Sequence, residues 1–156
     1  MTQAQRPSVF DYAGGYQAWL NFAGALHERC LADPVLNHPF SHSLDPQHID
    51  HLAHYLGEVF GGPATYTQTC GGHSAMLRLH AGSEAERDLA PRFVDCFVAA
   101  ADDAALPDDP EFRQVLRDYI TYATGEVDSY SPRGSVVAPN LGFPRWSWDG
   151  LEPPRP

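Results

Sequence analysis

GGPATYTQTCGGHSAMLRLH, residues 61–80, is the stretch of sequence on which the fold of this chain depends. Gly61-Gly62-Pro63 ends a helix, because glycine permits a sharp change of direction and proline cannot continue the helical hydrogen bonds. A passage broken by glycine follows over residues 65–73, and residues 74–80 have the pattern of a short helix ending in one histidine. The stretch therefore predicts a turn and a short helix between longer helical segments.

Helical periodicity extends on both sides of this stretch. Apolar residues recur at helical spacing over residues 16–32, 49–60, 89–100 and 112–127, and residues 8–13 fit one or two further turns. Asp45-Pro46 and Asp109-Pro110 each combine a capping side chain with a proline at the first helical position, and Ser83-x-x-Glu86 is a capping box. No strand pattern of convincing length is present, so the predicted fold class is all-α.

Length, charge and cysteine content limit the partners, the location and the types of site that the chain can have. The chain of 156 residues suits one hydrophobic core, and its net charge of −10 disfavours nucleic acid or an anionic membrane as a partner. No apolar run is long enough to span a bilayer, and the first residues lack the apolar core of a secretory signal, so we expect a cytoplasmic location. The three cysteines, Cys30, Cys70 and Cys96, are far apart and predict neither a disulfide framework nor a zinc knuckle.

The chain is expected to divide at about residue 130. Residues 1–130 would form the helical domain, and residues 131–156, which are rich in proline, would form a C-terminal extension packed on the domain or extending from it. Trp146 and Trp148 are the residues expected to anchor this extension on the body.

His80 is the foremost candidate ligand for a metal. An iron ligand must present a neutral imidazole nitrogen from a rigid apolar wall while its other nitrogen donates to a backbone carbonyl. Met76, Leu77 and Leu79 can supply such a wall. A histidine at a helix end is also a common capping or surface residue, and the local pattern leaves both interpretations open.

Other histidines form a second set of candidates. His27 and His48 flank the apolar faces of two helices that should pack together, so both can point toward a bound molecule, although His48 in a first helical turn can also be solvated. A zinc site is a competing interpretation of the segment that contains His38, His42, His48, His51 and His54. Histidines three residues apart drift around a helix, and no His-Glu-x-x-His motif or cysteine pair accompanies them, which disfavours zinc.

The order of these features resembles the group II truncated haemoglobins over roughly residues 10–130. The residues that carry the resemblance are Gly14-Gly15, Val35-Leu36, Gly61-Gly62-Pro63-x-Thr65-Tyr66, Gly72-His73 and Met76-Leu77-Arg78-Leu79-His80. The resemblance implies a two-over-two helical sandwich around haem b, with His80 as the proximal iron ligand.

The resemblance also assigns the other site residues. The positions that match the distal side of the haem are His27, Phe40, His48, Leu52 and Phe93. The remaining cofactor-binding candidates are Met76 and Leu77, together with Tyr66, His73 and Arg78 at the haem edge and propionates.

Two positions depart from the family pattern. Group II proteins typically have a tryptophan where Phe93 stands, and phenylalanine cannot donate the indole hydrogen bond to a bound ligand. Many members have a tyrosine where His27 stands. Imidazoles would then be the distal donors, with His48 as the first candidate and His27 as the second.

The resemblance implies a protein that binds O₂ and other diatomic ligands, such as NO and CO, in oxygen binding or transport. NO dioxygenase-type or peroxidase-type turnover, with a reductase as partner, rests on family analogy. Two alternatives stay open. If a distal histidine reaches the iron, the protein becomes a six-coordinate haem sensor or electron carrier. If His80 is an ordinary helix-end residue, the chain is a helical interaction module without a cofactor.

Overall fold

The computed structural model describes residues 6–37, 47–84 and 89–153. The regular secondary structure of the described residues is helical except for one short hairpin, which confirms the predicted all-α class. Its helices are α1 (Val9–Ala13), α2 (Tyr16–Ala32), α4 (His48–Val59), α5 (Thr65–Cys70), α6 (Gly72–His80), α7 (Leu89–Asp103) and α8 (Pro110–Ser129). The hairpin pairs the antiparallel strands β1 (Trp146–Ser147) and β2 (Gly150–Leu151).

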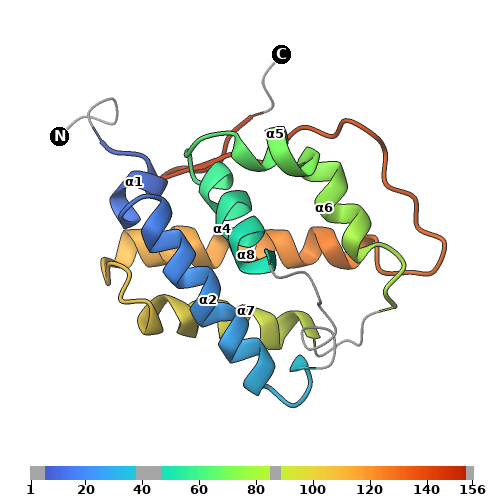
Figure 1. Cartoon of the computed structure of the whole chain (residues 1–156), viewed down its shortest axis with the longest axis horizontal. Coiled ribbons are helices and arrows are strands. Elements are labelled where there is room, and N and C mark those ends of the chain that lie inside the picture. Colours follow the sequence, from blue (N-terminus) through green and yellow to red (C-terminus); the bar gives the residue numbers. More distant parts are fainter. Residues whose placement is uncertain (1–5, 38–46, 85–88, 154–156) are drawn as a thin grey trace.

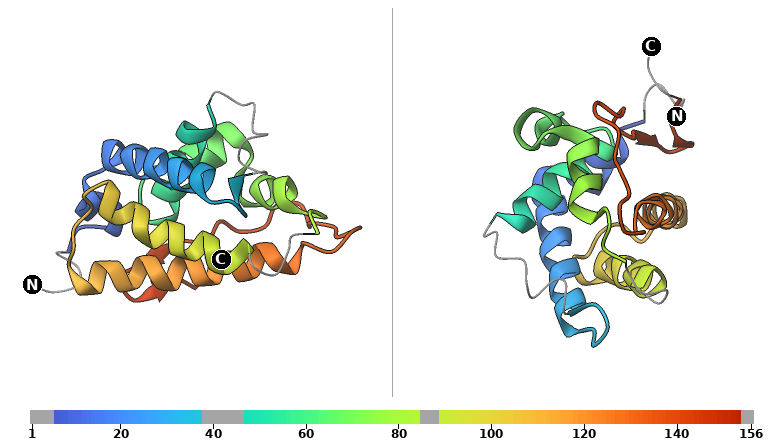
Figure 2. Two further views of the ribbon diagram at one scale, coloured as in Figure 1. Left: turned by 90° about the horizontal axis from the view of Figure 1, so that it is seen from below. Right: turned by 90° about the vertical axis from the view of Figure 1, so that its right-hand side faces the viewer.

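The long helices pack in two layers. Helix α2 packs on α4 and on α7, and α7 packs on α8. Figure 1 shows α4, α5 and α6 as an arch, in which α4 and α6 run in opposite directions. Figure 2 shows α7 and α8 side by side in the layer beneath α2. This is the two-over-two helical sandwich that the sequence predicts.

The cap predicted at Asp109 forms, because its carboxylate accepts the backbone N–H of Phe112 at 3.1 Å at the start of α8. A further cap lies at the start of α1, where the Ser8 hydroxyl accepts the backbone N–H of Asp11 at 3.0 Å. Helix α2 spans residues 16–32, as its periodicity predicts. The cap at Asp45-Pro46 and Glu86 of the capping box lie outside the described residues.

Two glycines allow the turn after α4 to close against α1. The N–H of Gly62 donates to the Gly57 carbonyl at 2.7 Å, and Gly61 has a φ of 98°. A Cβ atom at Gly62 would lie 2.7 Å from the Gly57 carbonyl oxygen and 2.8 Å from Cδ1 of Phe10. The Phe10 ring therefore occupies the space that side chains at this turn would need.

Residues 65–73 were predicted as an irregular passage, and this prediction was wrong. The passage forms α5, and α6 begins at Gly72 rather than at Ser74. Helix α5 depends on a contact from another helix: the Glu58 carboxylate of α4, which is 1% exposed, accepts the backbone N–H of Thr67 at 2.9 Å and also its hydroxyl. A carboxylate at a helix N-terminus satisfies an orphan donor and complements the helix dipole.

The core lies between the two layers and is rich in aromatic side chains. Its largest fully buried members are Trp19, Phe22, Phe60, Phe97 and Phe112. Cys30 and Cys96 are free thiols buried in this core. No helix in the described ranges is both long and apolar enough to cross a membrane.

The C-terminal extension returns along the body toward the N-terminal segment (Figure 1). Trp146 is 7% exposed and packs against Tyr119, with ring centroids 5.7 Å apart. The Trp148 indole donates to the Pro7 carbonyl at 2.8 Å, and the Arg6 guanidinium lies 3.6 Å from the centre of its ring. Both tryptophans therefore attach residues 131–153 to the helical body.

Candidate haem-binding site

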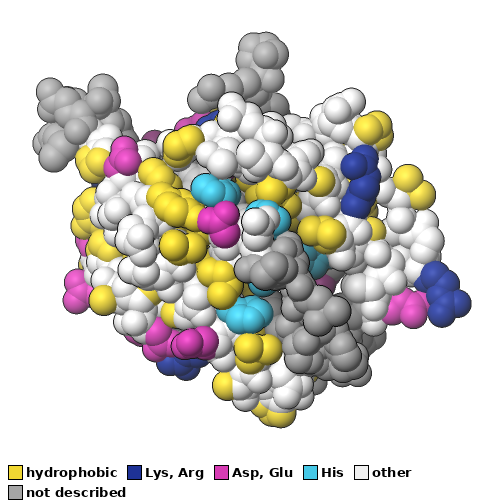
Figure 3. All heavy atoms as spheres, viewed as in Figure 1, with side chains coloured by type: hydrophobic (Ala, Val, Ile, Leu, Met, Phe, Trp, Pro, Cys, Tyr) yellow, Lys and Arg dark blue, Asp and Glu magenta, His cyan; other side chains and the backbone are white. Residues whose placement is uncertain are grey.

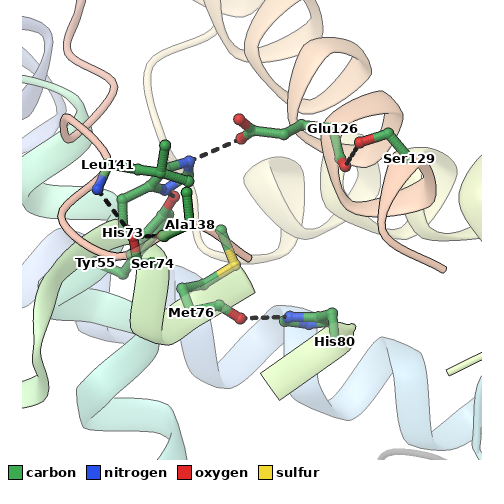
Figure 4. A network of polar contacts seen from close by, with 9 residues as sticks. All are labelled: Tyr55, His73, Ser74, Met76, His80, Glu126, Ser129, Ala138 and Leu141. Atoms are coloured by element: carbon green, nitrogen blue, oxygen red, sulfur yellow. Dashed lines mark hydrogen bonds and ion pairs between the residues drawn. The ribbon is translucent and has the colours of Figure 1, made fainter. Parts of the chain in front are cut away.

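His80 occupies the last position of α6, and its side chain is exposed. Its Nδ1 lies 2.9 Å from the Met76 carbonyl oxygen, one helical turn earlier (Figure 4). A carbonyl only accepts, so Nδ1 carries the proton and Nε2 carries the lone pair. A metal-ligating imidazole is held in the same manner, with its second nitrogen bonded to a backbone carbonyl.

The residues around His80 divide between the core and the surface. Leu77 is fully buried, and Leu52, Met76 and Phe93 are partly buried and pack against the core. Leu79 is 79% exposed, so the apolar wall expected from Met76, Leu77 and Leu79 does not include it. Arg78 is exposed as well.

His27 and His48 lie side by side. They come from α2 and α4, which pack together as predicted, and their ring centroids are 5.5 Å apart at an interplanar angle of 57°. Both side chains are half-buried. Two imidazoles in this arrangement can offer an N–H donor or a lone pair to a molecule bound next to them.

His73 is held inside the protein rather than at an open edge. It is 4% exposed, its Nδ1 lies 2.9 Å from the Tyr55 hydroxyl, and its Nε2 lies 2.9 Å from a carboxylate oxygen of Glu126. Both ring nitrogens have protein partners, so a hydrogen bond to a haem propionate would require one of these contacts to break. Tyr55 and Glu126 escaped the sequence analysis, because their only link to His73 is the packing of α4 and α8.

Tyr66 is also buried, at 5% exposed, and its ring lies 5.0 Å from that of Tyr55. Burial raises the pKa of Tyr66 to about 12. Tyr66 thus belongs to an aromatic cluster with Tyr55 and Phe143, and its predicted contact with a haem edge stays a prediction.

Histidine side chains gather on the face of the molecule shown in Figure 3. The half-buried His54 of α4 pairs with Asp50 at 3.5 Å and stacks on Tyr16 with ring centroids 4.6 Å apart, so its neighbours are other protein side chains. Phe40, His38 and His42 lie outside the described residues. Within the described ranges, no three His, Cys, Asp or Glu side chains come together as a metal site.

The residues present fit a haem group. One imidazole has its Nδ1 fixed on a carbonyl and its Nε2 available, which suits a single axial bond to iron. A pair of imidazoles on neighbouring helices and several partly buried apolar side chains supply the other features of a haem pocket.

Comparisons with known proteins identify the family of the chain. The sequence model of the family described as bacterial-like globin matches residues 8–127. The hemoglobin of Chloroflexus aurantiacus is 26% identical, with a TM-score of 0.67 over 78% of this chain and 98% of that chain. The hemoglobin of Thermobifida fusca is also 26% identical, with a TM-score of 0.66 over 78% and 96% of the two chains.

More distant neighbours support the fold alone. The group II truncated hemoglobin of Bacillus anthracis is 20% identical, with a TM-score of 0.66 over 79% of this chain and 92% of that one. No curated protein matches the sequence. The family match covers most of the helical body, from α1 to α8, and includes the turn after α4 and His80. The chain therefore belongs to the bacterial-like globin family.

Proposed function

We propose that this protein binds haem b through His80 and uses the iron to bind O₂ and other diatomic ligands, such as NO and CO, reversibly. The observation that carries the proposal is the 2.9 Å contact between Nδ1 of His80 and the Met76 carbonyl oxygen in a chain of the globin family. This contact fixes the tautomer and the ring orientation that an axial imidazole needs.

The other residues have assigned roles in this proposal. Leu52, Met76, Leu77 and Phe93 would enclose the porphyrin with apolar surface, and Phe40, outside the described residues, is the further candidate by family resemblance. Tyr66, His73 and Arg78 are the candidates for its edge and propionates. A bound haem supplies an iron whose ligand affinity and redox behaviour are tuned by the axial ligand and by the distal hydrogen bonds.

His48 and His27 are proposed as the distal donors. Bound O₂ carries partial negative charge, so an imidazole N–H close to it stabilises the complex. Their half-buried positions and their 5.5 Å ring separation support a shared role. Redox turnover, as an NO dioxygenase or a peroxidase with a separate reductase, is part of the proposal by analogy with the family.

The same imidazole pair favours a second candidate function. If His48 or His27 bonds to the iron, the resting protein is six-coordinate and acts as a sensor or an electron carrier. External ligands would then bind slowly, because the internal imidazole must leave first. The absorption spectra of the ferrous protein separate the two functions, because the six-coordinate state has a low-spin spectrum before any ligand is added.

The deciding experiment is haem reconstitution of the wild type, His80→Gly and the surface control His54→Gln, each recorded with and without CO. We expect a red wild-type protein whose Soret band shifts with CO and an unchanged control. His80→Gly should lose the histidine-ligated ferrous spectrum and regain it when imidazole is added. A colourless wild type would support the helical interaction module, and an unaltered His80→Gly spectrum would show that another residue ligates the iron.

A further inference from the structure

A buried hydrogen-bonded chain joins three helices close to the proposed haem site. It runs from the Tyr55 hydroxyl of α4 through the His73 imidazole of α6 to the Glu126 carboxylate of α8, with both heavy-atom distances at 2.9 Å (Figure 4). Tyr55 is 6% exposed and His73 is 4% exposed. Of these three residues, the haem-binding role proposed above involves only His73, as a candidate contact for a propionate.

The partners determine where the protons lie. The Glu126 carboxylate only accepts, so Nε2 of His73 carries the proton and donates it. Nδ1 of His73 then has a free lone pair and accepts the hydroxyl proton of Tyr55. Tyr55 therefore has a base within hydrogen-bond distance, and this base has a carboxylate behind it that stabilises a positive charge on the ring.

We propose that Tyr55 is a redox-active tyrosine that loses one electron to an oxidised haem while its hydroxyl proton moves to His73. The inference rests on the proposed function only in that the haem, after reaction with a hydroperoxide, supplies the oxidant. In the step, the Tyr55 O–H bond breaks, an Nδ1–H bond forms on His73, and the electron leaves for the oxidant. The products are a neutral phenoxyl radical and an imidazolium paired with Glu126.

The surroundings of Tyr55 suit this step. Burial, followed by the nearby charges of Tyr119 and Glu126, holds the pKa of Tyr55 well above its usual value, so the phenol stays neutral until it is oxidised. A phenol that loses an electron becomes a much stronger acid, and His73 is positioned to take the proton at that moment. The rings of Tyr66 and Phe143, with centroids 5.0 and 4.9 Å from that of Tyr55, shield the resulting radical.

Oxidisable rings continue from Tyr55 to the surface. Tyr119 lies close enough to Tyr55 for its charge to raise the pKa of Tyr55, the Tyr119 ring lies 5.7 Å from that of Trp146, and the Trp146 ring lies 5.8 Å from that of Tyr122. Tyr122 is 40% exposed. A small phenolic reductant at Tyr122 can thus return the electron through these rings, while His73 returns the proton to Tyr55.

The complete reaction balances as a peroxidation. One hydroperoxide, ROOH, and two phenols, ArOH, give ROH, water and two phenoxyl radicals. The proposed substrate class is therefore a hydroperoxide at the haem and a small phenol at the surface. Tyr55 and His73 lie on α4 and α6, each seven residues from a histidine of the proposed haem site, His48 and His80 respectively.

The test is electron paramagnetic resonance of the ferric haem protein, freeze-quenched after addition of hydrogen peroxide. Ring-deuterated tyrosine identifies a tyrosyl signal by its narrowed hyperfine pattern. We expect this signal in the wild type and in the control Tyr12→Phe, whose ring lies elsewhere, against Phe112 and Trp148. Tyr55→Phe should reduce the signal to background.

A second variant guards against misfolding of Tyr55→Phe. Glu126→Gln changes a side chain that is 25% exposed and keeps an oxygen acceptor for His73, but it removes the counter-charge of the imidazolium. We expect its absorption spectrum to match the wild type and its radical yield to fall by about tenfold, the scale of one lost charge-assisted hydrogen bond. Wild-type radical yields in both Tyr55→Phe and Glu126→Gln would overturn the proposal.

The haem and the tyrosine can be tested separately. If the protein binds no haem, the proposed function fails; if it binds haem that does not react with peroxide, the haem cannot supply the oxidant for Tyr55. The transfer of an electron from Tyr55 and of its proton to His73, here called the relay, is then tested with a photo-oxidised ruthenium trisbipyridine complex as the oxidant. The phenoxyl absorption is compared among the wild type, Tyr55→Phe and Tyr12→Phe. A loss confined to Tyr55→Phe supports the relay, and equal signals in all three proteins overturn it.

Discussion

Two histidines of α6, His73 and His80, are held in opposite ways. His73 is almost fully buried with partners at both nitrogens, and His80 is exposed with its Nδ1 on the carbonyl one turn earlier. The partners of each ring decide its chemistry: His73 is placed to move a proton between protein groups, and His80 is placed to offer Nε2 to a metal. The two residues thus share their type and their helix, while their roles differ.

Replacing the distal imidazoles should separate their contributions. We expect His48→Leu to raise the O₂ dissociation rate by about tenfold, because a lost hydrogen bond to the ligand costs about 1.4 kcal/mol. His27→Leu should have a smaller effect if His48 is the principal donor. Stopped-flow displacement of O₂ by CO measures both rates, and unchanged rates in the two variants would refute the imidazole-donor assignment.

Tyr66 should make the stability of the fold depend on pH in the alkaline range. Burial raises its pKa from the usual 10.0 to about 12, so the neutral form is favoured in the folded state. The associated stability is fully present below pH 10 and is lost as the pH rises toward 12, since the unfolded chain releases its phenolic proton first. Tyr66→Phe should flatten this loss in urea unfolding curves recorded between those pH values, and Tyr12→Phe should not.

At the scale of single residues, the sequence predicts local contacts better than distant ones. The His80–Met76 bond joins residues four apart on one helix, so the requirement for a carbonyl acceptor could be stated in advance. The Tyr55–His73–Glu126 chain joins residues 18 and 53 positions apart. Its existence depends on how α4, α6 and α8 pack, which no local pattern specifies.

At the scale of elements, the turn after α4 is the tightest junction described above. We expect Gly62→Ala to destabilise the protein by about 1–3 kcal/mol, because its Cβ would clash with the Gly57 carbonyl oxygen and the Phe10 ring. Gly125→Ala, in open space on α8, is the matched control and should add about 1 kcal/mol of stability. Denaturant unfolding measures the change in the free energy of unfolding in both variants. Equal changes would show that α1 moves aside for the new methyl group without loss of stability.

The same turn shows why α5 was missed from the sequence. The segment Thr65–Cys70 has little helical periodicity, and three of its six residues are threonines with weak helix propensity. The buried Glu58 carboxylate supplies the stabilising contact from outside the segment. The cap at Asp109 was predictable because its donor and acceptor lie three residues apart.

At the scale of the whole molecule, the C-terminal extension is bound to the helix that carries His80. The Ser74 hydroxyl, near the start of α6, donates to the Ala138 carbonyl at 2.8 Å and accepts the N–H of Leu141 at 2.9 Å. Ser74 is 4% exposed, so both backbone groups depend on one buried side chain. Trp146 and Trp148 in a proline-rich segment predicted an anchor for the extension. The two hydrogen bonds of Ser74 to the extension, which we call the Ser74 bridge, have no sequence signature.

The bridge leads to a prediction about haem retention. Ser74→Ala would leave two backbone groups without their partner, at a cost of about 1–3 kcal/mol each. The loosened α6 should release haem to an excess of apomyoglobin about tenfold faster, which corresponds to about 1.4 kcal/mol. Ser135→Ala, whose hydroxyl bonds only to the Pro132 carbonyl within the extension, is the control and should retain haem as the wild type does. If Ser74→Ala unfolds earlier in denaturant but keeps its haem, the extension stabilises the fold without supporting the proximal helix. Equal rates of haem release and equal unfolding curves for the two variants would mean that the contact of Ser74 with the extension supports neither haem retention nor the fold.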